Sequence, residues 1–193
     1  MNSDRLEGID ELIAPCLENP PAVHPWVVAA AADFASYADI FRFDFDSAVR
    51  WQEWAEPYHK QTRGPFASIY GQCLCGIAVN EKLDVAAAEK HFRTALRRAR
   101  RNGGIHTHGG RLAAAMLGEL LYEQGRIDEA EALLDESNLL GIEGGATDFM
   151  IARFGTAARL KMLQGNREAA VSLLAEGLRV AALHDLPRLR ARI

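Results

Sequence analysis

The chain has 193 residues, of which 49% are hydrophobic and 25% are charged, as in ordinary soluble globular proteins. A formal net charge of −4 gives no general attraction to nucleic acid or to anionic membranes, so we expect neither as a direct partner. No apolar run approaches the roughly 18–20 residues that span a bilayer, and the first residues lack the order of a secretory signal. Because three cysteines make no disulfide framework, we expect a cytoplasmic protein.

A period of about 40 residues organises the chain. Alanines recur at spacings of 40, 42 and 40 residues, at Ala48, Ala88, Ala130 and Ala170. Twelve residues before each alanine the chain again has a small residue, namely Ser36, Gly76, Gly118 and Ala158. A large side chain where two helices cross would hold their backbones apart, so we expect the two sets to face each other. The period predicts an all-α solenoid of helical hairpins.

The first two hairpins are predicted from apolar residues at helical spacing. The first pairs a helix over Pro25–Ile40 with one over Asp46–Lys60, and we expect Pro57 to kink or end the latter early. The second pairs Phe66–Asn80 with Asp84–Arg101.

The third and fourth hairpins follow the same plan. In the third, Arg111–Gln124 precedes a helix that begins near Asp128 and ends at Gly141, since glycine is a common helix stop. The fourth pairs Phe149–Gln164 with Arg167–Leu183.

Both ends of the chain continue the pattern. Asp4–Leu17 reads as the second helix of an earlier hairpin, and Leu186–Leu189 begins what looks like the next unit. We therefore expect about four full hairpins plus a half-hairpin at each end. On this view residues 1–193 form a single repeat domain that is a segment of a larger multidomain protein.

Few residues suggest chemistry. A metal site needs three or four converging ligands, and His106-Thr107-His108 has no carboxylate nearby, so we expect a polar loop and no metal. Cys73 and Cys75 point about 200° apart on a helix, which favours packing over a reactive thiol. With no phosphate-binding loop and no nucleophile elbow, we expect neither an enzyme nor a cofactor.

A basic run, Arg97-Arg98-Ala99-Arg100-Arg101, ends one predicted helix. It could hold phosphate, nucleic acid, an acidic protein partner or a neighbouring domain. It could equally be a solvated helix end, where cations complement the helix dipole. Aromatic residues leave a second choice open, because Tyr37, Tyr70 and Tyr122 lie on the first helices of three successive hairpins. They could line a ligand groove or fill the core between repeats.

Several motifs resemble a known repeat family. Leu117-Gly118, Gly125 and Ala130 match the tetratricopeptide pattern, although the period is longer than that family's roughly 34 residues. Leu117–Glu123, Ile127–Glu131, the Gly144-Gly145-x-x-Asp148-x-Met150 motif and Asp185–Leu189 together resemble the MalT-like helical repeat region. Such regions occur in LuxR-family ATP-dependent transcription regulators and in some bacterial serine/threonine kinases.

The resemblance implies a right-handed α-solenoid of tetratricopeptide-like hairpins. It also implies a non-catalytic sensor or interaction domain of a bacterial signalling or transcription-regulatory protein, which binds a small effector, another domain of its parent, or a partner protein on its concave face. The alternative is a general tetratricopeptide-type protein scaffold without a small-molecule ligand. In tetratricopeptide arrays set first-helix positions line the groove, and here these are Asp33, Tyr37, Tyr70, Asn80, Glu119, Tyr122 and Arg159.

Overall fold

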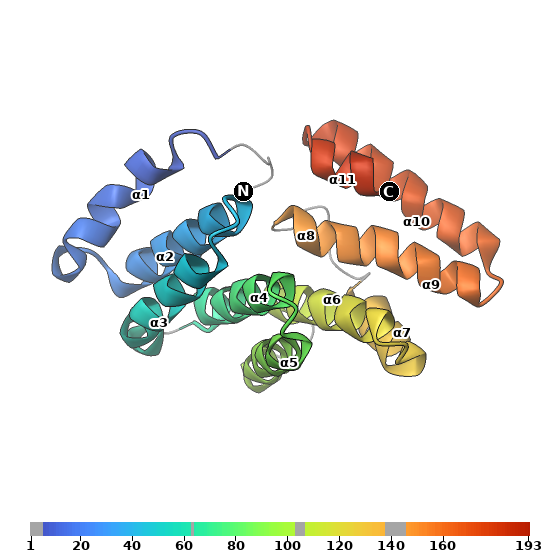
Figure 1. The fold of residues 1–193 in the computed structure, drawn as a ribbon, viewed down its shortest axis with the longest axis horizontal. Helices are drawn as coiled ribbons and strands as arrows, with labels where there is room; N and C mark the ends of the chain where they lie inside the picture. Colours follow the sequence, from blue (N-terminus) through green and yellow to red (C-terminus); the bar gives the residue numbers. More distant parts are fainter. Residues whose placement is uncertain (1–5, 63, 103–106, 138–145) are drawn as a thin grey trace. The chain divides into compact units, whose positions relative to one another are not determined.

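The structure is a computed structural model that describes residues 6–62, 64–102, 107–137 and 146–193. Its contacts divide the described residues into two compact units, which we name the N-terminal unit (Leu6–Ala113) and the C-terminal unit (Ala114–Ile193). Throughout the described ranges the secondary structure is helical, without a strand, which confirms the predicted all-α fold class (Figure 1). That all 193 residues form one repeat domain stays a prediction.

The N-terminal unit is a stack of two complete hairpins. Its elements are α1 (Ile9–Glu18), η1 (Pro20–Ala22), α2 (Pro25–Phe41), α3 (Phe45–Gln61), α4 (Phe66–Glu81), α5 (Val85–Arg101) and the first residues of α6 (His108–Glu123). Helices α2 and α3 pair with each other, as do α4 and α5, and α4 also packs against α2 and α3 (Figure 1). Helix α1 lies along α2, as expected for the second helix of a preceding repeat.

The C-terminal unit continues the hairpin plan. It contains the rest of α6, then α7 (Ile127–Ser137), α8 (Thr147–Met150), the π-helical segment η2 (Ile151–Thr156), α9 (Ala157–Leu163), α10 (Arg167–Leu183) and α11 (Pro187–Arg192). Helix α7 packs against η2 and α9, α9 pairs with α10, and α11 packs on α10. The backbone stays helical from α8 through η2 to α9, so these three form one helix with a widened turn.

The predicted crossing of small residues is confirmed in the first and third hairpins, and in the second the two helices also approach closely, at Gly76 and Phe92. In the first, the Ser36 hydroxyl donates to the Ala48 carbonyl oxygen at 2.5 Å. In the second, a Cβ added to Gly76 would lie 2.3 Å from the Phe92 ring. In the third, a Cβ added to Gly118 would lie 2.8 Å from the Leu134 side chain and 3.4 Å from the Ala130 carbonyl oxygen. The helices are therefore too close together for a larger side chain at these positions.

Each hairpin turn uses the same backbone device. One residue adopts a left-handed conformation, with φ of 60° to 75°, at Phe43, Leu83, Gly125 and Gly165. In three of the four turns the next residue caps the second helix through its side chain, at Asp44, Asp84 and Asn166. Each cap accepts a hydrogen bond from the backbone N–H three residues later, which satisfies a helix end that would otherwise lack a partner.

Several helix bounds differ from the predictions. The early end at Pro57 is wrong, because α3 continues to Gln61. Pro57 lacks the N–H that would donate to the Glu53 carbonyl oxygen, so one helical hydrogen bond is lost. Because Glu53 is exposed, water can replace that donor. Helix α1 begins at Ile9 rather than Asp4, since Gly8 precedes it with a left-handed φ of 74°. The predicted stop at Gly141 lies outside the described residues.

Candidate functional site

Three of the predicted site residues come together in the C-terminal unit. Glu119 and Tyr122 lie one turn apart on α6, and Arg159 lies on α9. The Arg159 guanidinium carbon is 5.8 Å from the centre of the Tyr122 ring, within cation–π range. Its Nη1 also lies 3.4 Å from Oε1 of Glu123. We name Glu119, Tyr122, Glu123, Thr156 and Arg159 the Glu119 cluster.

The Glu119 carboxyl is the titratable centre of this cluster. Burial raises the pKa of Glu119 to about 7, and the nearby Asp148 carboxylate adds to that rise. A hydrogen bond from the Thr156 hydroxyl to Oε1, at 2.9 Å, and the Arg159 charge act in the opposite direction. The carboxyl therefore changes its charge near neutral pH, in a position where a bound cation or hydrogen-bond donor could shift that equilibrium.

Thr156 contacts Glu119, and the sequence analysis did not anticipate this contact. It is fully buried at the end of η2, a π-helical turn that the apolar pattern of Phe149–Gln164 did not reveal. Such wide turns re-aim side chains within a helix and often occur at functional sites. Here the wide turn ends at the hydroxyl that meets Glu119.

The predicted site residues of the N-terminal unit are largely buried. The exposed fractions of Asp33, Tyr37 and Tyr70 are 5%, 2% and 5%. The Tyr37 ring packs edge-on against Phe41, with centres 4.8 Å apart. Burial favours the alternative in which these side chains fill the core between hairpins, and their part in ligand binding stays a prediction.

Asn80 lies far from Tyr70 along the same helix. It lies ten residues beyond Tyr70 on α4, about 15 Å along the helix axis. Its backbone carbonyl accepts the Leu83 N–H at 2.8 Å, so its observed contact belongs to the hairpin turn.

Asp33 belongs to a buried polar network that sequence reasoning missed. Gln52 on α3 donates to the Ser36 hydroxyl at 3.1 Å, and its carbonyl oxygen lies 3.2 Å from Nε2 of His59. A Cβ on Gly71 would lie 1.9 Å from that same oxygen, so glycine makes room for the Gln52 amide. Burial raises the pKa of Asp33 and lowers the pKa of His59, which favours the neutral form of both. A signal was present in the sequence, because Gln52 occupies a repeat position that is apolar in the other hairpins.

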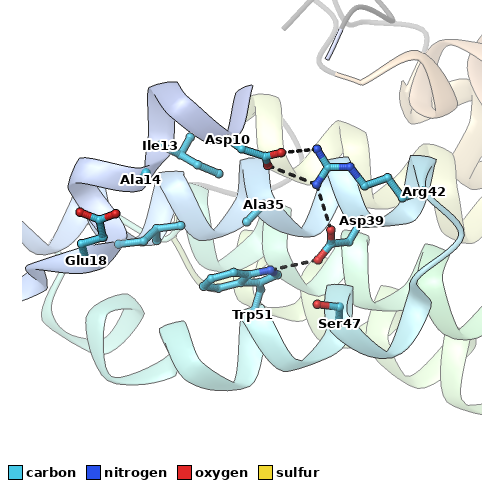
Figure 2. Close-up of a pocket in the computed structure, with 10 residues that line it drawn as sticks. Asp10, Ile13, Ala14, Glu18, Ala35, Asp39, Arg42, Ser47 and Trp51 are labelled. Atoms are coloured by element: carbon cyan, nitrogen blue, oxygen red, sulfur yellow. Dashed lines mark hydrogen bonds and ion pairs between the residues drawn. The ribbon is translucent and has the colours of Figure 1, made fainter. Parts of the chain in front are cut away.

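A pocket opens between α1 and the α2–α3 hairpin, and Figure 2 shows its lining. Its volume is about 420 Å³, and we name it the α1 pocket; it is lined by Asp10, Ile13, Ala14, Leu17, Glu18, Ala35, Asp39, Arg42, Ser47 and Trp51. At one end Arg42 pairs with Asp10 at 2.5 Å and with Asp39 at 3.4 Å, and the Trp51 indole N–H donates to Asp39 at 3.0 Å (Figure 2). Because three separate helices supply the lining, no local sequence motif predicted this pocket.

The structure also describes the surroundings of the two cysteines and of the basic run. Burial raises the pKa of both thiols, that of Cys75 to about 12, so Cys73 and Cys75 resist ionisation and fit a packing role. Within the described ranges no group of three or more metal-ligating side chains occurs, and His106 lies outside those ranges. In the basic run, Arg98 donates to the Ser68 carbonyl oxygen at 3.3 Å.

Comparisons with known proteins find relatives over nearly the whole chain. No family model matches it. It is 43% identical, over 191 residues, to the serine/threonine-protein kinase PknK of Mycobacterium tuberculosis, strains CDC 1551 and H37Rv, and of Mycobacterium bovis. The alignment covers 99% of this chain and only 17% of each kinase, so the chain spans about a sixth of the length of these relatives.

A solved structure shares the fold. The chain resembles BtubC (BKLC) from P. vanneervenii with a TM-score of 0.63, over 91% of this chain and 73% of that chain, at 15% sequence identity. None of the helices in the described ranges is long and apolar enough to cross a bilayer. The chain is thus a helical-hairpin repeat protein that is homologous to one segment of a mycobacterial serine/threonine-protein kinase.

Proposed function

We propose that this chain is a non-catalytic sensor or interaction module of a bacterial signalling protein of the serine/threonine kinase type, located in the cytoplasm. The alignment with PknK carries the proposal, since it runs through nearly the whole chain and yet takes up only 17% of the kinase. A kinase active site needs a glycine-rich loop over the phosphates and a lysine on a strand. The sequence has no such loop, and the described residues form no strand.

The module binds a small effector, another domain of its parent or a partner protein, and occupancy biases an on/off equilibrium of the parent. The stacked helical hairpins and the resemblance of the sequence to MalT-like repeats support this proposal, and the PknK alignment favours a kinase over a transcription regulator as the parent. The Glu119 cluster is the proposed contact site on the first helices of the C-terminal unit, since it offers an aromatic ring, a cation and a titratable carboxyl together. A scaffold that binds proteins alone is the alternative.

A chimera tests the proposal. This chain would replace the matching 191-residue segment of M. tuberculosis PknK, beside intact PknK and a variant that lacks the segment. We expect the isolated chain to transfer no labelled phosphate from ATP, and the chimera to match intact PknK in activity where the deletion variant does not. Phosphoryl transfer by the isolated chain, or a chimera that behaves like the deletion, would overturn the proposal.

A binding screen then separates the two alternatives. The isolated chain is screened by thermal shift against metabolites, sugars and nucleotides, and by pull-down against PknK that lacks the segment. Tyr122→Ala should weaken whichever interaction is found and leave the helical circular dichroism unchanged, because Tyr122 is only partly buried. Loss of helicity in Tyr122→Ala with no change in binding would assign this side chain to packing.

A further inference from the structure

The α1 pocket has the size of a ligand site and shares no residue with the Glu119 cluster. Its volume of about 420 Å³ falls within the range of roughly 300–1,000 Å³ that is typical of such sites. The pocket is partly open to solvent, and α1, α2 and α3 all contribute to it. A side chain of another molecule can therefore enter without any rearrangement of the hairpin.

One wall of the α1 pocket is apolar and already oriented. Ile13 and Leu17 on α1 and Ala35 on α2 belong to the same apolar cluster as Trp51, which comes from α3 (Figure 2). The hydrogen bond from the Trp51 indole to Asp39 holds the ring in place, so a ligand would not have to order it. A fixed indole beside aliphatic side chains suits an alkyl chain, and its face attracts cations.

The charges of the pocket are unbalanced. Asp10, Asp39 and Glu18 are acidic, whereas Arg42 is the basic residue of the lining. At one end of the pocket Arg42 donates hydrogen bonds to Asp10 and Asp39, and Glu18 lies at the other end of the pocket (Figure 2). Within the part of the chain that the structure describes, Glu18 has no basic partner. A ligand cation would supply one.

The end of α1 strengthens this preference. Glu18 is the last residue of α1, and the last turn of that helix contains no basic residue. The carbonyl groups at a helix C-terminus carry partial negative charge, so they add to the attraction of the carboxylate for a cation.

We propose that the α1 pocket binds an arginine or lysine side chain of a partner protein, together with the apolar residue beside it. The alkyl stem lies along Leu17 and Trp51, and the cationic head meets Glu18 at the end of α1. The partner is a polypeptide because the half-open pocket admits a side chain from a passing backbone. This proposal rests on the proposed function and names the chemistry of the partner.

Peptide titrations test the pocket chemistry. An acetylated leucine–arginine–leucine amide is titrated into the ¹⁵N-labelled chain, beside the same peptide with citrulline, the neutral isostere of arginine, and beside free agmatine. We expect the arginine peptide to shift the Glu18 amide and the Trp51 indole signals, with binding about fivefold tighter than the citrulline peptide and weakened by salt. Equal binding of the citrulline peptide would overturn the role of the cation. Agmatine that binds as tightly as the arginine peptide would overturn the partner protein as the source.

Two variants locate the site. Glu18→Gln should weaken binding of the arginine peptide about three- to fivefold. Glu81→Gln, at the last position of α4, should leave that binding unchanged. Ala14→Phe should block the pocket without altering any charge. Melting temperatures confirm that each variant is folded. If Glu18→Gln and Ala14→Phe bind the peptide like the natural chain, the pocket proposal fails, whereas the PknK chimera reports on the module function separately.

Discussion

The two units build the same hairpin turn from different residues. The N-terminal unit places Phe43 and Leu83 in the left-handed conformation, and the C-terminal unit places Gly125 and Gly165 there. A side chain in this conformation costs about 1 kcal/mol relative to glycine. Phe43 and Leu83 are 80% and 86% exposed, so burial does not offset that cost. The hairpin packing and the capping residue therefore impose the turn, and Phe43 or Leu83 adopts the left-handed conformation despite its cost.

The units also differ in how they bury carboxyl groups. In the N-terminal unit Asp33 lies within the Gln52–His59 network between hairpins. In the C-terminal unit Glu119 meets a single hydroxyl at the end of a π-helical turn. Both carboxyls have a raised pKa because burial disfavours the charged form, but only Glu119 lies beside a cation–π pair at a partly open surface. A repeat fold can thus place similar chemistry in unlike settings.

Helix crossings should give the largest difference between the units. Gly76→Ala pushes a Cβ into the rigid Phe92 ring, and we expect a loss of about 2 kcal/mol of unfolding free energy even after the gain in helix propensity. Gly118→Ala meets the flexible Leu134 side chain and should cost less than about 1 kcal/mol, while Gly118→Leu should cost about 3 kcal/mol. Urea unfolding followed by circular dichroism measures all three. Unchanged stability of Gly118→Leu would contradict the crossing geometry.

Glu119 should make stability depend on pH. Its pKa rises from 4.5 to about 7 on folding, so between these values the folded chain binds more protons than the unfolded chain. Stability from this group is therefore full below pH 4.5 and falls as pH rises towards 7. Glu119→Gln keeps the Thr156 contact and should be more stable than the natural chain by about 2 kcal/mol at pH 8, with little difference at pH 4. A constant offset between the two melting curves from pH 4 to 8 would speak against a titrating Glu119.

Exchanging turn residues between the units should have a smaller effect. Phe43→Gly and Leu83→Gly should each raise the unfolding free energy by up to about 0.5 kcal/mol, since relief of strain exceeds the added entropy of the unfolded chain. Gly125→Ala should lower it by about 1 kcal/mol, as the position keeps a φ of 75° with nothing else nearby. Thermal melts of the three variants provide the measurement. Destabilisation by Phe43→Gly would show that the edge-on contact between the Phe43 and Phe45 rings outweighs the relief of strain.

Ion pairs should give the smallest difference. Lys82 pairs with Asp46 while 47% of its side chain is exposed, whereas Lys161 pairs with Glu131 and Asp135 and is 16% exposed. Exposed pairs contribute little and are screened by salt. We expect Lys82→Met to leave the melting temperature unchanged and Lys161→Met to lower it slightly. The comparison is repeated at high salt, where equal losses for both variants would show that burial does not distinguish them.

Much of the hairpin plan followed from the sequence alone. The recurring small residues placed the crossings of Ser36 with Ala48 and of Gly118 with Ala130, and the bounds of α10 agree with the prediction of Arg167–Leu183. A repeat can be read in this way because its periodic contacts are local: each hairpin repeats the same small set of close approaches. The sequence also singled out Glu119, Tyr122 and Arg159 on first helices, which the structure brings together, and their part in binding stays a prediction.

Only the tertiary structure decided the rest. The α1 pocket draws its lining from three helices, and Gln52 finds its place only because Gly71 on another helix leaves room for it. The π-helical turn before α9 was not visible in the periodic pattern of apolar residues. The sequence determined the order of the hairpins and two of the places where their helices must approach closely, because those requirements act on neighbouring residues. Cavities, buried polar partners and raised pKa values arise among side chains that are distant along the chain, so they exist only once the helices are packed.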